Sequence, residues 1–235
     1  MRLAHPRGWH GPGMGEAIGQ LLPFAVGVAI SPMPIVAVVL MLVTPRAKVN
    51  GPAFLLGWIA GVAGTGAILL ALAGPANASQ DGAPADWVNW LKLVLGVLLL
   101  ALAVHQWRGR AREAATPKWM SALDSFTPAK SAGMAVLLSA VNPKNLLFIV
   151  GGAAAVAATG IGTGDQVVAW AVFTVLASIG VAAPVVIYFG LGDRAPRLLD
   201  ELKTWLAHNN TAIMSVLILI IGVKLIGDAI SGFSA

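Results

Sequence analysis

The sequence contains no cysteine and few charged residues. The absence of cysteine from its 235 residues excludes disulfides, thiol redox chemistry and thiolate metal sites. Charged side chains make up 11% of the chain, against about a quarter in soluble domains. Hydrophobic residues make up 57%, and the mean hydropathy is +0.81. These values are typical of an integral membrane protein.

Six apolar stretches are long enough to cross a bilayer, which takes about 20 residues per helix. They lack the alternation of a barrel strand, and lipid offers no water to unpaired backbone groups, so all six are predicted to be helices. The chain is therefore predicted to form a single all-α integral membrane domain over residues 1–235. The predicted spans cover about residues 15–43, 52–73, 87–107, 131–157, 165–190 and 211–231.

Basic residues predict the orientation in the membrane. The pI is about 10.0, but the Lys and Arg side chains lie in short loops and form no patch suited to nucleic acid, so no nucleic-acid partner is expected. Most of them follow spans 1, 3 and 5, whereas the other side carries Arg2 and Arg7. By the positive-inside rule, both termini of this multi-pass protein are predicted to be extracytoplasmic.

The two halves of the chain show a weak internal repeat. The string "VAISPMPIVAVVLML" aligns with "LSAVNPKNLLFIVGG", which places Pro32 on Pro143, and "LVLGVLLLAL" aligns with "LIIGVKLIGD", which places Gly96 on Gly222. Since each half has three spans, the second must be inverted relative to the first, as in many secondary transporters. The predicted repeats cover about residues 15–107 and 131–231, joined by a cytoplasmic linker at 108–130.

Spans 1 and 4 each contain a proline motif, "SPMP" at 31–34 and "NPKN" at 142–145. An interior proline removes a helical hydrogen bond and disfavours helix in the residue before it. Both spans are therefore predicted to be broken, and each new half-helix offers free N–H groups that favour an anion. One proline would simply indicate a kink, but two at matched depth favour a binding site.

Three charged residues lie inside the predicted spans once the ends of the spans are set aside. Lys144 is close to the midplane, where an unpaired lysine costs several kcal/mol, and its own span offers no carboxylate within helical reach. An anionic ligand group is favoured as its partner, the alternative being the carbonyl groups exposed by the break. Lys224 and Asp228 are four residues apart and share a helical face, which fits either an interfacial ion pair or a gating or coupling role.

Three stretches taken together resemble a known family. They are "LLPFAVGVAISPMPIVAVVLMLVTPRAKVNGPAFLLGW", "PKWMSALDSFTPAKSAG" and "NPKNLLF". In order and spacing they resemble the GAP family, the peptidoglycolipid- or sulfolipid-1-addressing proteins of the lysine exporter (LysE) superfamily, over about residues 17–231. This resemblance implies a six-helix plasma-membrane protein of actinobacteria that assists glycolipid export. It also implies a substrate path lined by Ser31, Pro32, Pro34, Asn142, Pro143, Lys144 and Asn145.

The predicted function is export or flipping of an amphiphilic lipid or glycolipid with an anionic or sugar head group. Two alternatives stay open: export of a small solute such as an amino acid or ion, and a non-transporting scaffold of a lipid-export complex. Membrane lipid is the expected partner, and a homodimer or an export machinery is left open. The spans contain no nucleophile–base pair or metal cluster, so no enzyme activity, catalytic residue, metal or cofactor is expected.

Overall fold

Helices form nearly all of the described structure. The protein is represented by a computed structural model, which describes residues 13–73, 79–80, 83–109 and 125–234. Most of the predicted linker 108–130 lies outside these ranges. Two short strands, β1 (Ser79–Gln80) and β2 (Ala83–Pro84), pair antiparallel. The helices are α1 (Met14–Ala29), α2 (Pro32–Leu42), α3 (Ala47–Ala73), α4 (Asp86–Gly109), α5 (Pro128–Ala140), α6 (Pro143–Ala158), α7 (Thr163–Leu191) and α8 (Ala195–Phe233), with a 3-10 turn η2 (Gly192–Arg194) before α8.

All six predicted apolar stretches lie in these helices. Four segments are long and apolar enough to cross a membrane, and the bent pairs α1–α2 and α5–α6 raise the number to as many as six if each pair is one span. The prediction of a helical, membrane-embedded protein is therefore confirmed. The four segments are Ala47–Ala73, Asp86–Arg108, Thr163–Leu206 and Thr211–Phe233.

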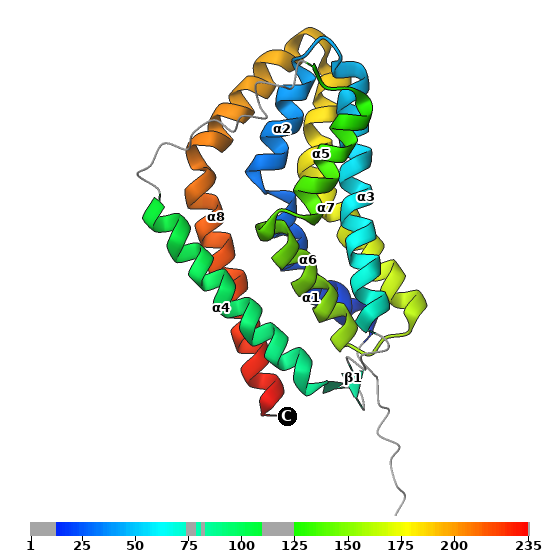
Figure 1. The fold of residues 1–235 in the computed structure, drawn as a ribbon, viewed down its shortest axis with the longest axis vertical. Coiled ribbons are helices and arrows are strands. Elements are labelled where there is room, and N and C mark those ends of the chain that lie inside the picture. Colours follow the sequence, from blue (N-terminus) through cyan, green and yellow to red (C-terminus); the bar gives the residue numbers. More distant parts are fainter. Residues whose placement is uncertain (1–12, 74–78, 81–82, 110–124, 235) are drawn as a thin grey trace, which may run out of the picture.

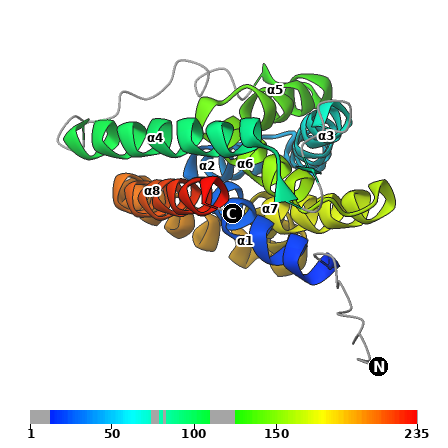
Figure 2. The same cartoon turned by 90° about the horizontal axis from the view of Figure 1, so that it is seen from below.

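The long helices α4 and α8 lie side by side along one side of the molecule, beside a bundle of the remaining helices (Figure 1 and Figure 2). They cross at two glycines. A Cβ atom on Gly96 would lie 2.9 Å from the carbonyl oxygen of Gly222, and one on Gly222 would lie 3.1 Å from that of Gly96. Small residues allow such close backbone approach between membrane helices. The two glycines that the sequence repeat aligns therefore contact each other.

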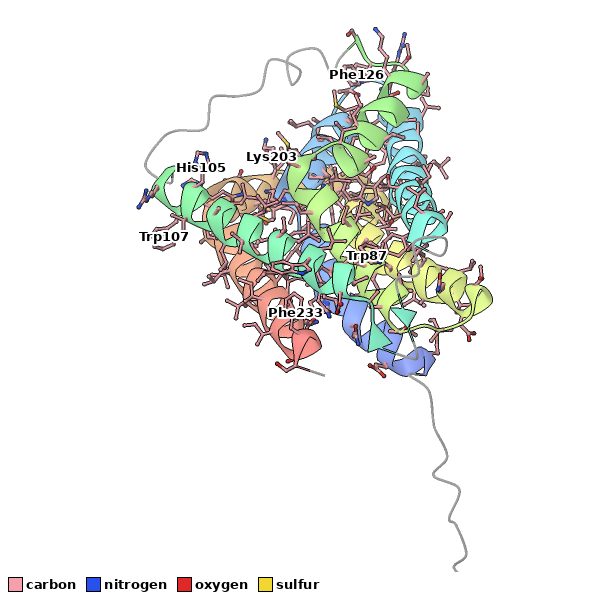
Figure 3. All side chains as sticks on the ribbon, turned by 60° about the horizontal axis from the view of Figure 1, so that its bottom comes forward. Trp87, His105, Trp107, Phe126, Lys203 and Phe233 are labelled. Atoms are coloured by element: carbon pink, nitrogen blue, oxygen red, sulfur yellow. The ribbon has the colours of Figure 1, made fainter. Side chains whose placement is uncertain are left out.

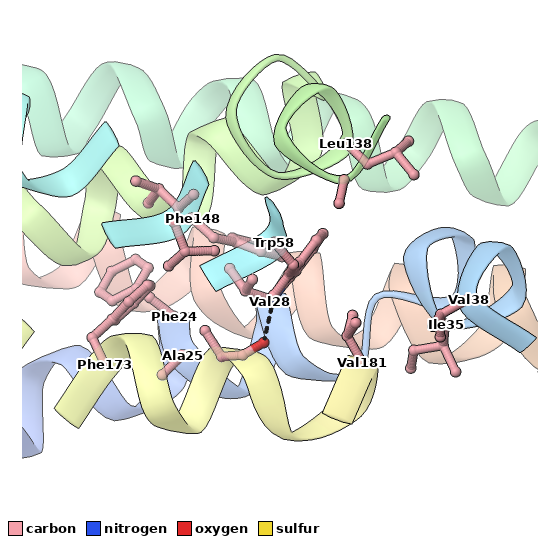
Figure 4. Packing of buried hydrophobic residues seen from close by; sticks show 14 of the residues in the cluster. Phe24, Ala25, Val28, Ile35, Val38, Trp58, Leu138, Phe148, Phe173 and Val181 are labelled. Atoms are coloured by element: carbon pink, nitrogen blue, oxygen red, sulfur yellow. Dashed lines mark hydrogen bonds between the residues drawn. The ribbon is translucent and has the colours of Figure 1, made fainter. Parts of the chain in front are cut away.

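Large aromatic side chains fill the bundle between α1, α3, α6 and α7. Phe24, Trp58, Phe148 and Phe173, one from each helix, are fully buried (Figure 4). The indole Nε1 of Trp58 donates a hydrogen bond to the Ala177 carbonyl oxygen at 3.3 Å, so its polar atom is paired inside the bundle. Because lipid is as apolar as these side chains, close packing holds the helices together in place of exclusion of water.

Two glycines allow α3 and α7 to approach the ends of the helices that precede the breaks. A Cβ atom on Gly61 of α3 would lie 2.0 Å from Ser139 Oγ near the end of α5. In the same way, a Cβ atom on Gly180 of α7 would lie 1.8 Å from the carbonyl oxygen of Ala29, the last residue of α1. Thus α3 packs on α5 much as α7 packs on α1.

The two ends of the molecule differ in charge. The hairpin end carries β1 and β2, the start of α1 and the end of α8 (Figure 1). The opposite end carries the starts of α3, α5 and α8, and the end of α4 lies beside α8 on the side away from the hairpin (Figure 1). These helix ends together are called the basic end. Cations gather at these helix ends. The described cations of the basic end are Arg46, Lys48, Arg108, Lys130, Arg194, Arg197 and Lys203.

Tryptophan side chains lie near both ends of α4. Trp87 lies at the start of the helix, which follows the hairpin, and Trp107 lies near its far end (Figure 3). At 1.5 Å per residue, the helix between them is about 30 Å long, which matches the hydrocarbon core of a bilayer. Tryptophan is enriched at both membrane–water interfaces. The spacing therefore agrees with an α4 that crosses the membrane.

Candidate substrate site at two helix breaks

The first break lies between α1 and α2. Helix α1 ends at Ala29, and Pro32 opens α2 at an angle of 47° to α1. Between them, Ser31 has φ −63° and ψ 113°, an extended backbone that proline favours in the residue before it. Proline is well suited to the first helical position, because the N–H it lacks would have no partner there. Both Pro32 and Pro34 are buried.

The second break, between α5 and α6, has the same construction. Helix α5 ends at Ala140, and Pro143 opens α6 at an angle of 62°. Asn142 has φ −61° and ψ 118°, and its side-chain oxygen accepts a hydrogen bond from the Lys144 backbone N–H at 3.1 Å, which caps the new helix. The predicted breaks at the two proline motifs are therefore confirmed.

Asn145 satisfies a backbone group that the second break frees. The backbone N–H of Asn142 donates to the Leu137 carbonyl and so does not make the usual helical bond to Leu138. Asn145 Nδ2 donates to the Leu138 carbonyl oxygen instead, at 2.9 Å. The other side-chain atom of this fully buried asparagine, Oδ1, has no partner among the described residues. One half of the amide therefore holds the break together, and the other half is free to accept a hydrogen bond.

The two breaks contact each other through one pair of side chains. Asn142 Nδ2 lies 3.7 Å from the Met33 sulfur in the first turn of α2. On the hairpin side of this meeting point, α1 packs closely along α6, whereas on the basic side α2 and α5 barely touch. The polar motifs thus lie where close packing between the broken helices ends.

Three polar groups at the breaks have no partner within the described part of the chain. Ser31 Oγ and Asn145 Oδ1 are buried without a hydrogen bond. Lys144 is half-buried, and its ammonium group makes neither a hydrogen bond nor an ion pair there. Such groups are costly in apolar surroundings unless something pairs with them. Together they offer a cation, a hydroxyl and an amide oxygen to a polar or anionic ligand.

The other predicted pair lies apart from the breaks. Lys224 Nζ forms an ion pair with Asp228 Oδ2 within α8. The same ammonium lies 5.9 Å from the centre of the Phe24 ring. The structure therefore contains the ion pair, and the gating or coupling role stays a prediction.

Sequence reasoning missed two buried polar residues on α4. Asn89 is 0% exposed and Lys92 is 5% exposed. Both stand within two turns of the start of the helix, where polar residues are expected to reach the membrane surface. The two residues are three positions apart and so share one helical face. This spacing was the sequence signal that could have identified them. Helix α8 packs along α4, and its Gly232 lies against Asn89.

These features define a class, that of polytopic helical membrane proteins with two broken helices that carry polar groups at their breaks. The model of the family Sap, sulfolipid-1-addressing protein, matches residues 21–231. The chain belongs to this family, and the resemblance drawn from its sequence motifs is confirmed. No curated protein and no solved structure matches the chain. Family and fold together indicate a membrane protein involved in lipid addressing.

Proposed function

We propose that this protein is a transporter that exports or flips an amphiphilic lipid with an anionic or sugar head group toward the cell envelope. It works as a transporter and not as an enzyme. The observation that carries the proposal is the contact between two similarly built helix breaks, whose polar groups Ser31 Oγ and Asn145 Oδ1 lack partners among the described residues. In secondary transporters, discontinuous helices of two inverted repeats form the substrate site in this way.

Several contacts support two inverted three-helix repeats, α1–α4 and α5–α8, with six spans. The residues before Pro32 and Pro143 have nearly the same backbone angles. Gly96 and Gly222, which the repeat aligns, contact each other at the crossing of α4 and α8. The packing of α3 on α5 resembles that of α7 on α1. A two-fold axis in the membrane plane, passing through the α4–α8 crossing, accounts for all three.

In this proposal the basic end is cytoplasmic and the hairpin end faces outward from the plasma membrane. The cations at the basic end support this orientation by the positive-inside rule. The broken helices are then packed together on the outward side and separated on the cytoplasmic side. A head group would reach the breaks from the cytoplasmic leaflet while its tails remain in lipid.

Lys144 is proposed to bind the head group. Its ammonium stands on the first turn of α6, where the free N–H groups and the positive end of the helix also favour an anion. Ser31 Oγ and Asn145 Oδ1 lie at the two breaks and are proposed to pair with hydroxyl or sugar groups. Pro32, Pro34, Asn142 and Pro143 are proposed to shape the site.

The proposal is tested with purified protein in liposomes. The probe is tail-labelled NBD-phosphatidylglycerol, and dithionite reports the fraction that reaches the outer leaflet. Protein-containing vesicles should move this anionic lipid faster than protein-free vesicles, and faster than they move NBD-phosphatidylcholine. Equal rates with and without protein would contradict transport and would favour the scaffold alternative. Uptake of a radiolabelled amino acid without lipid movement would favour the small-solute alternative.

A further inference from the structure

We infer that the contact between α4 and α8 near the hairpin end forms a second anion site, made by Lys92, Lys224 and Asn89, for a phosphate or sulfate group. This inference rests on the proposed function, because it makes the site a receiving point for the head group of an exported lipid. The residues that form it lie on α4 and α8, away from the two breaks.

The side chain of Asn89 is the most unusual feature of this region. It is completely buried, and neither Nδ2 nor Oδ1 has a hydrogen-bond partner among the described residues. The α8 backbone lies against it: a Cβ atom on Gly232 would lie 2.3 Å from Asn89 Oδ1. A buried amide without partners is costly, and its NH2 group can donate two hydrogen bonds.

Lys92 stands one turn further along α4 on the same face, and it is 95% removed from solvent by the packing of the helices. Within the described ranges it makes no direct hydrogen bond or ion pair, and the charges that act on it are those of Asp228 and Lys224. Asp228 is already bound by Lys224. Two ammonium groups therefore share one carboxylate, which leaves one positive charge without compensation between the helices.

An anion would remove both deficits. Its negative charge would balance the second lysine, and its oxygen atoms would accept from the amide of Asn89. Charge-assisted hydrogen bonds of this kind are about twice as strong as neutral ones. A phosphate or sulfate group is favoured because it presents several oxygen acceptors to donors that come from two helices.

The site lies further along the same path as the breaks. Phe148 follows Lys144 by one turn of α6, and a Cβ atom on Gly27 would lie 2.9 Å from Phe148 and 3.0 Å from Ile221 of α8. Helices α1, α6 and α8 therefore meet there. Lys224 follows on α8, beside Phe24, which stands about 10 Å along α1 from the first break at 1.5 Å per residue. The buried side chain of Phe148, packed beside Gly27 of α1, thus lies between Lys144 and the two lysines Lys92 and Lys224.

The alternative explanation is that Lys92, Lys224 and Asp228 are a structural ion network with no ligand. The two explanations predict different effects of Asp228→Asn on anion binding. In an anion site, Asp228 competes with the ligand, so Asp228→Asn should strengthen anion binding. In a structural network, Asp228→Asn leaves two lysines unpaired and creates no ligand site. General damage to the fold could only weaken binding.

The experiment measures binding to the full chain in detergent by isothermal titration calorimetry. All variants carry Lys144→Ala, so that the breaks do not contribute. The probes are dihexanoyl-phosphatidylglycerol, dihexanoyl-phosphatidylcholine and inorganic phosphate, which separate a lipid head group from a free anion. Lys92→Gln should weaken phosphatidylglycerol binding about tenfold or more, the size of a lost hydrogen bond to a charged group. Asp228→Asn should strengthen it, and Lys48→Gln, an exposed lysine of the basic end, should leave it unchanged.

Equal binding of the two lipids, or unchanged binding in Lys92→Gln, would overturn the inference, as would weaker binding in Asp228→Asn. If inorganic phosphate binds as tightly as phosphatidylglycerol and responds in the same way to Lys92→Gln and Asp228→Asn, the result would support the anion site and contradict its role as a receiving point for lipid. These binding results can be separated from the lipid-movement assay. If the protein moves lipid but fails the binding tests, the proposed function stands and the anion site is refuted. If it passes the binding tests but moves no lipid, the anion site stands and the proposed function is refuted.

Discussion

The contact of α3 with α5 allows a sharp test of the packing. A Cβ atom on Gly57 would lie 2.3 Å from the carbonyl oxygen and 2.7 Å from the Cα atom of Ala132, whereas ordinary contacts of a Cβ atom begin at 3.4 Å. The atoms it meets belong to the backbone and cannot rotate away. We expect Gly57→Ala to move α3 and α5 apart or to distort them locally.

The magnitude follows from a matched pair of variants. Gly64 lies on the same helix, and a Cβ atom there would meet nothing within 4 Å. Both changes gain up to about 1 kcal/mol of helix propensity, but only Gly57→Ala adds an overlap, and overpacking costs about 1–3 kcal/mol. The difference between the variants therefore isolates the overlap. Gly57→Ala should be less stable than Gly64→Ala by about 1–3 kcal/mol.

The assay measures the free energy of reversible unfolding of both variants in parallel. Steric trapping in bicelles or titration with SDS gives this free energy. If the two alanine variants have the same free energy of unfolding, α3 and α5 do not approach as described. A more stable Gly57→Ala protein would refute the reasoning outright.

Two further predictions use the absence of cysteine, which lets introduced thiols react without background. The double variant Met33→Cys with Asn142→Cys should cross-link under mild oxidation, because the two side chains are in contact at 3.7 Å; Met33→Cys with Thr163→Cys should not, and the opposite pattern would show that the breaks do not meet. In intact cells, Thr163→Cys at the start of α7 should react with a membrane-impermeant maleimide, and Lys48→Cys only after permeabilisation. The reverse labelling would invert the proposed orientation.

Much of the fold could be predicted because membrane helices follow simple rules. Apolar length alone places the spans, and proline acts on its own backbone and on the residue before it, so the breaks at Pro32 and Pro143 could be located without knowledge of tertiary structure. The glycine alignment was also informative, because Gly96 and Gly222 prove to be neighbours. These are local or repeated signals, which a sequence carries directly.

The candidate sites were only partly predictable, because burial depends on which helix covers a residue. Lys92 and Asn89 stand near the start of α4, where a sequence suggests contact with water, but the packing of the helices, including α8, buries them. In contrast, Lys144 could be singled out because its depth follows from its position along a single span. That Asn145 pairs with a carbonyl of α5 depends on the bend angle, which sequence does not provide.

The most direct test of the central claim compares Lys144→Ala with Lys48→Ala in NBD-phosphatidylglycerol movement, each reconstituted at the same protein-to-lipid ratio. The variants remove the same charge, one at the break and one at the exposed basic end. The account predicts that Lys144→Ala slows lipid movement about tenfold or more, as expected for loss of a hydrogen bond to a charged group, and that Lys48→Ala moves lipid at the wild-type rate. Equal rates for the two variants would contradict the claim that the helix breaks bind the head group through Lys144.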